Sequence, residues 1–138
     1  MMIDPGTLTT FRESLERCQA DPHFLNQFYN NFVIANPVVR EKFANTDMET
    51  QKMMLHASFY MIALATQGNG AASLYLDKIA RRHSNTYLDI SSELYELWLE
   101  TLLKTVKEID PDCSQPILSA WTDVMQFGID FMQAGNRH

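Results

Sequence analysis

Apolar residues recur at intervals of three and four along most of the chain, and no stretch keeps the strict alternation that is typical of a strand. This spacing predicts an all-α protein with about seven helices. In the first of them, Leu8, Phe11, Leu15 and Cys18 share one face, which we expect to be buried. The helices are expected over 7–18, 22–35, 37–43, 46–67, 71–83, 90–106 and 117–131.

Helix boundaries are marked by a few local signals. Asp21–Pro22 supplies a cap and a first-turn proline for the second helix. Asn36–Pro37 breaks that helix, because the residue before a proline is disfavoured in the α region. Thr46 with Glu49 three residues later predicts a capping box at the start of a long helix. Asp110–Pro111 predicts the turn between the last two helices.

The size and charge of the chain narrow its function. At 138 residues it fits a single domain over 1–138, large enough to bury a core without metal or disulfide cross-links. The net charge is -6, and the 11 basic residues form no run longer than Arg81–Arg82. Nucleic acid is therefore not expected as a partner, since a binding surface for it needs clustered positive charge.

Neither the N-terminal residues nor the most apolar segment of the sequence favours export or insertion into a membrane. The first residues, MMIDPGTL, lack the basic start and apolar stretch of a signal peptide. The most apolar window, MMLHASFYMIALAT, is shorter than the roughly 20 residues that span a bilayer. Cys18 and Cys113 form neither a CxxC pair nor a CxxCH motif, so both are expected as reduced thiols. We expect a cytoplasmic protein.

One histidine stands out by its position. His83 ends the segment SLYLDKIARRH and lies on the apolar stripe of Leu76, Ile79 and Ala80. An imidazole on such a face suggests an iron ligand, although a single histidine there is more often an ordinary core residue. Whether His83 is an iron ligand or a core residue therefore depends on the other residues found with it in the sequence.

Three residues upstream of His83 complete a known combination. They are Tyr29 in NQFYNNF, Phe43 in VVREKF and Gln51 in DMETQKMML. With His83 they resemble the globin family, specifically the bacterial single-domain globins and the heme domain of flavohemoglobins. The resemblance extends from about Thr7 to Met132 and implies a globin fold around a buried heme pocket.

The resemblance also implies a cofactor and its ligands. Because no CxxCH motif is present, the heme would be noncovalent heme b, iron protoporphyrin IX. His83 would bind the iron, Tyr29 and Gln51 would face a gas ligand on the opposite side, and Phe43 would contact the porphyrin. His56 is turned about 100° away from the face of Leu55 and is expected at the surface.

Further contacts follow from the same resemblance. Arg82, next to His83, is the candidate partner of a heme propionate. The other expected cofactor contacts are Met54, Leu55, Ile79, Ile90, Tyr95 and Trp98. The family also carries a glutamate on its last helix that supports the iron-binding histidine, whereas FGIDFMQAGNRH contains none. Asp130 and Gln133 are the candidates to replace it.

The function implied by the resemblance is reversible binding of O2, NO or CO. This would serve oxygen binding and transport, or NO detoxification with an external reductase. Enzyme activity would be at most that of an NO dioxygenase or a weak peroxidase. Two alternatives remain open: a gas or redox sensor domain acting on a signalling partner, and a heme-free globin fold used as an interaction module. A homodimer is also left open.

Overall fold

The computed structural model describes residues 3–82 and 91–135. His83 and Ile90 lie outside these residues, and Arg82 is described only by its backbone. Seven helices and no strand occur in this part of the chain, which confirms the all-α prediction. The helices are α1 (Pro5–Ala20), α2 (Phe24–Ala35), α3 (Pro37–Lys42), α4 (Met48–Thr66), α5 (Gly70–Arg82), α6 (Ser92–Ile109) and α7 (Gln115–Gly135).

The starts of the first two helices differ from the prediction. Helix α1 begins at Pro5 because the Asp4 carboxylate accepts hydrogen bonds from the backbone N–H groups of Gly6 and Thr7, at 2.9 and 3.3 Å. Helix α2 begins at Phe24, not at Pro22. The Asp21 carboxylate accepts from the His23 N–H at 2.8 Å and so forms a turn before the helix.

The predicted capping box at Thr46 is wrong by one residue. Asp47 caps α4 instead, and its carboxylate accepts from the Glu49 backbone N–H at 3.1 Å. Thr46 directs its hydroxyl to the carbonyl of Lys42 at 3.5 Å. The predicted end of this helix is confirmed by Gly68, whose φ of 82° lies in the left-handed region that favours glycine.

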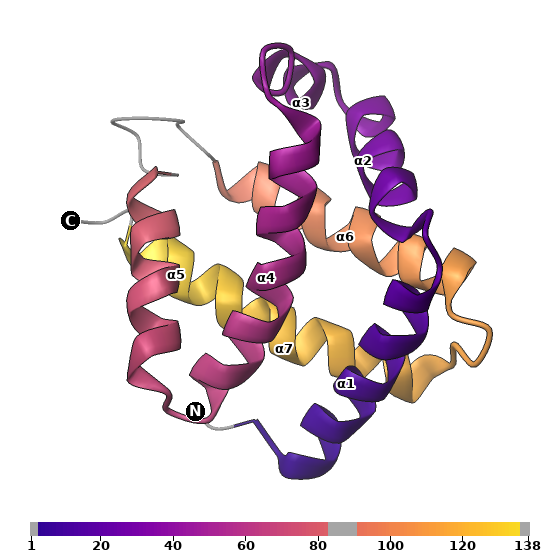
Figure 1. Cartoon of the computed structure of the whole chain (residues 1–138), viewed down its shortest axis with the longest axis vertical. Coiled ribbons are helices and arrows are strands. Elements are labelled where there is room, and N and C mark those ends of the chain that lie inside the picture. The colour runs from indigo at the N-terminus through magenta and orange to yellow at the C-terminus, as the bar shows by residue number, and fades with distance from the viewer. Residues whose placement is uncertain (1–2, 83–90, 136–138) are drawn as a thin grey trace.

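Helix α7 is the centre of the fold. It packs against α1, α4, α5 and α6, while α2 packs mainly along α6. Figure 1 shows α6 and α7 passing behind α4, with α1 and α2 beside it. Within the described residues, none of the helices combines the length and apolar character that a membrane span requires.

One half of the core is filled by aromatic rings. The Trp121 ring lies 4.8 Å from that of Phe11, 5.6 Å from Phe59 and 6.3 Å from Phe24, measured between centroids. The predicted inward face of α1 is confirmed, since Leu8, Phe11, Leu15 and Cys18 are all buried. We call this region, where α1 meets the first half of α7, the packed half.

A polar network lies inside the packed half. Asp110, at the end of α6, accepts hydrogen bonds from Ser14 Oγ at 2.6 Å and from Arg17 Nε at 2.7 Å. The indole of Trp121 donates to the same Ser14 oxygen at 2.8 Å. Cys18 is buried close by, and desolvation raises the pKa of its thiol to about 12. The network ties α1, α6 and α7 together.

Candidate functional site

The other half of the core contains a cavity. The cavity has a volume of about 230 Å³. Each of the helices α2 to α7 contributes residues to its wall. Protein interiors rarely leave voids much larger than one water molecule. A space of this size with a mostly apolar wall therefore indicates a bulky, largely apolar ligand. We call the surrounding region the cavity half.

Most of the predicted site residues that the structure describes line this cavity. They come from four different helices and from the end of α3, so distant parts of the sequence converge at one place. These residues are Tyr29, Phe43, Gln51, Met54, Leu55, Ile79, Tyr95 and Trp98. His83 and Ile90, and the side chain of Arg82, are not described.

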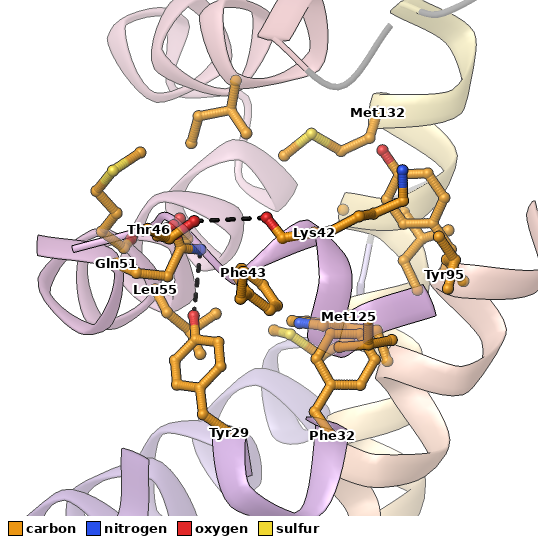
Figure 2. A pocket seen from close by; sticks show the side chains of 18 of the residues that line it. Tyr29, Phe32, Lys42, Phe43, Thr46, Gln51, Leu55, Tyr95, Met125 and Met132 are labelled. Carbon is orange, nitrogen blue, oxygen red and sulfur yellow. Dashed lines mark hydrogen bonds between the residues drawn. The ribbon is translucent and has the colours of Figure 1, made fainter. Parts of the chain in front are cut away.

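Tyr29 and Gln51 form a polar pair on the cavity wall. The Gln51 side-chain amide donates to the Tyr29 hydroxyl oxygen at 3.3 Å, linking α4 to α2 (Figure 2). Tyr29 is only 6% exposed, and this burial raises the pKa of its hydroxyl to about 12 despite the opposing hydrogen bond. The hydroxyl therefore stays protonated at neutral pH. Because its oxygen accepts from Gln51, its proton can be donated elsewhere.

Phe43 is held by two neighbouring rings. It follows α3, a helix that Asn36 caps by accepting from the Val38 N–H at 2.8 Å. Its ring packs edge-on against Tyr29, with centroids 5.6 Å apart and planes at 81°, and lies 6.2 Å from Phe32. These contacts fix Phe43 as a flat apolar part of the cavity wall.

Comparison with known proteins places this arrangement in a family. No protein-family model matches the sequence. The chain is 29% identical over 106 residues to a flavohemoprotein of Vibrio cholerae, covering 75% of this chain and 26% of the relative. It thus spans about a quarter of the length of that protein.

A solved structure gives a fuller match. A Pseudomonas aeruginosa protein, described as structurally highly homologous to a human hemoglobin, superposes with a TM-score of 0.88 at 36% sequence identity. The match covers 94% of this chain and 98% of the other. This chain belongs to the bacterial globin family. The predicted globin fold is therefore confirmed.

The two described histidines of this globin lie away from the cavity. His23 precedes α2 and is exposed. His56 is exposed on α4, with its ring 5.6 Å from that of Tyr60, as expected from its angle to Leu55. Neither lines the cavity, so within residues 3–82 and 91–135 no imidazole faces the space.

Helix α7 supplies a wall of this globin's cavity that the sequence did not single out. Gly128 packs closely against α4, since a Cβ atom there would lie 2.7 Å from Cδ1 of Ile62. Asp130 and Gln133, the candidates to replace the missing glutamate, instead contact Gln126 and Ser92, each at 2.8–2.9 Å. Neither lines the cavity.

Sequence reasoning missed eleven lining residues in all. Most are apolar residues that looked like ordinary core. The one charged side chain among the missed residues is Lys42, and its position directly before Phe43 was the signal that could have found it. The missed residues are Phe32, Val39, Lys42, Thr46, Ser58, Ile62, Leu94, Met125, Gly128, Ile129 and Met132.

Proposed function

We propose that this globin binds heme in its internal cavity and, through the heme, a diatomic gas. The observation that supports this most strongly is the cavity itself, whose wall combines apolar surface with one neutral hydrogen-bonding pair. The apolar residues fit the faces of a porphyrin, and the printed similarity to a flavohemoprotein is consistent with the same cofactor.

Heme b, bound without a covalent link, would supply the iron atom to which O2, NO or CO binds. Phe43, Leu55, Ile79 and Tyr95 would hold it by apolar contact from four sides of the cavity. We propose His83 as the iron ligand. It is the residue that directly follows α5, four positions after the cavity-lining Ile79.

Tyr29 and Gln51 would act on the gas. The Tyr29 hydroxyl remains protonated and keeps a donor available, while Gln51 fixes the position of its oxygen. A gas ligand that carries partial negative charge would accept this hydrogen bond, which in a dry site contributes about 1.5 to 3 kcal/mol. The pair therefore favours O2 over CO.

The role that we propose is oxygen binding or NO detoxification with a separate reductase as the electron donor. A sensor acting on a signalling partner would use the same cavity and the same polar pair. Turnover of NO in the presence of a generic reductase separates the two roles, since a sensor requires no turnover.

An absorption spectrum of the purified protein with added heme tests the proposal. We expect a Soret band at one heme per chain that shifts with dithionite and CO. A wild-type protein without this band would contradict heme binding and favour the heme-free interaction module.

A pair of histidine variants tests the ligand. His83→Ala should abolish stoichiometric heme uptake, whereas the exposed His56→Ala should retain it. Uptake at the wild-type level in His83→Ala would transfer the role of iron ligand to another residue.

A further inference from the structure

Lys42 occupies a position shared by two hollows. It is the last residue of α3, half-buried, and lines the internal cavity. It also lines a second hollow of about 500 Å³ at the surface, between α3 and the start of α6. Leu94 is the other residue that borders both. Lys42 therefore stands where the interior cavity meets the surface.

The residues that line the two hollows include more acidic than basic side chains. Among the described residues that line the two hollows, Lys42 is the sole cation. The surface hollow carries three exposed carboxylates along α6, those of Glu93, Glu96 and Glu100. A negatively charged group at this edge of the cavity would be repelled by the glutamates unless an ammonium group lay closer to it.

The shape of the lysine side chain suits such a role. A lysine at a boundary between apolar surface and water commonly covers apolar wall with its methylene stem and keeps its ammonium group at the polar edge. Figure 2 shows the stem of Lys42 running across the cavity toward the side where Tyr95 lies.

We propose that Lys42 holds a carboxylate of the ligand in the cavity. The inference rests on the proposed function, in which that ligand is heme and the carboxylate is one of its propionates. The sequence pointed to Arg82, at the end of α5, for this contact, and Lys42 adds a cation from the end of α3. An ammonium–carboxylate hydrogen bond is among the stronger polar contacts available to a protein.

The test compares iron protoporphyrin IX with its dimethyl ester, which has the same ring and metal but no carboxylates. The dissociation rate of each is measured by transfer to an excess of a heme scavenger. Lys42→Met should release iron protoporphyrin IX about three- to tenfold faster, a range that allows for the partial exposure of the contact. Release of the ester should be the same in Lys42→Met and in the wild type.

Three further variants separate charge from packing. Lys42→Arg should keep slow release of iron protoporphyrin IX. Lys107→Met, which removes an exposed charge at the other end of α6, should have no effect. Glu96→Gln should slow the release, because it removes a repulsive charge from the surface hollow. This opposite sign would not arise from a purely structural role of Lys42.

The outcomes are distinct. If Lys42→Met accelerates release of both ligands equally, or of neither, Lys42 does not bind a carboxylate and the inference is wrong. If the wild-type protein binds neither ligand, the proposed function fails, and this is visible before any variant is made. A selective effect on iron protoporphyrin IX, reversed in sign by Glu96→Gln, supports the inference.

Discussion

The packed half and the cavity half of this globin treat buried polar groups in opposite ways. In the packed half, Asp110 accepts from Ser14, from Arg17 and from the backbone N–H of Asp112. In the cavity half, Tyr29 is buried with one acceptor bond and retains a donor beside an open space. The packed half satisfies its polar groups internally, whereas the cavity half keeps hydrogen-bonding capacity for a ligand.

The same contrast is visible in the two ionisable groups. Burial opposes the charge of Asp110, but hydrogen bonds from Arg17 and Ser14 outweigh it, and the pKa of the carboxyl is held below its ordinary value. Burial of Tyr29 raises its pKa to about 12 because the single hydrogen bond from Gln51, which favours the phenolate, does not outweigh the loss of solvation. The hydrogen-bond partners therefore decide whether a buried group is charged: Asp110 is ionised at neutral pH, whereas Tyr29 is neutral.

The largest effect is expected in the packed half. Asp110→Ala leaves Arg17 and Ser14 without their acceptor and should lower the free energy of unfolding of the heme-free protein by about 3 kcal/mol. Denaturant unfolding measures this loss. The control is Asp112→Ala, an exposed carboxylate 3.6 Å from Arg17, which should cost less than about 1 kcal/mol. Equal losses in the two variants would contradict the importance of the buried network.

The next effect belongs to the cavity half. Tyr29→Phe removes the available donor and should accelerate O2 release roughly ten- to hundredfold, with a much smaller change for CO. Stopped-flow measurements on the heme-loaded protein give both rates. Tyr60→Phe is the matched control, since Tyr60 lies on the outside of α4 and its hydroxyl donates to Gln19. An unchanged O2 release rate in Tyr29→Phe would show that the hydroxyl does not reach the gas.

Added methyl groups should distinguish the halves more finely. Ala120→Val enlarges a buried residue beside Trp121 and should destabilise the heme-free protein by about 1 to 3 kcal/mol. Gly128→Ala should push the Ile62 side chain into the cavity, where there is space for it. The energetic cost of this movement is offset by a gain in helix propensity of about 1 kcal/mol. We therefore expect Gly128→Ala to leave the heme-free stability almost unchanged and to accelerate heme release, because the displaced Ile62 takes up cavity space. A large loss of heme-free stability in Gly128→Ala would mean that the cavity wall is rigid.

The smallest effects are expected in the pH dependence of stability. The pKa of Asp110 is lowered on folding, so its contribution is present above about pH 4 and is lost as the pH falls through the folded pKa. The pKa of Tyr29 is raised from 10.0, so its contribution is complete below pH 10 and is lost as the pH rises through about 12. Asp110→Ala should flatten only the acid limb of the stability curve, and Tyr29→Phe only the alkaline limb. Unfolding measured across both limits tests this.

The helices were predictable because apolar spacing and the Pro and Gly breaks are local signals. The starts of α2 and α4 were misplaced because neighbouring residues compete as caps: Thr46 and Asp47 both qualify, and only the geometry assigns the Glu49 N–H to Asp47. The Ser14–Asp110 bond joins residues 96 positions apart, and from the sequence Asp110 is simply a turn residue. No local pattern could have revealed this partner.

The candidate site was predictable only in part. Tyr29, Phe43 and Gln51 were found by resemblance, and the structure brings them to one cavity. The lining residues of α7 were missed because periodicity shows which face of a helix is turned inward, but not whether that face meets a side chain or a void. Met125 and Val124 are both fully buried, yet only Met125 lines the cavity.

The internal network of the packed half has a consequence for the order of assembly. Ser14, Arg17 and Asp110 complete their hydrogen bonds without an outside molecule, so we expect this half of the protein to fold before the heme that we propose is bound. In the proposed role, the heme-free protein would persist in a folded form, and its conversion to the heme-bound form would follow the supply of heme rather than the rate of translation.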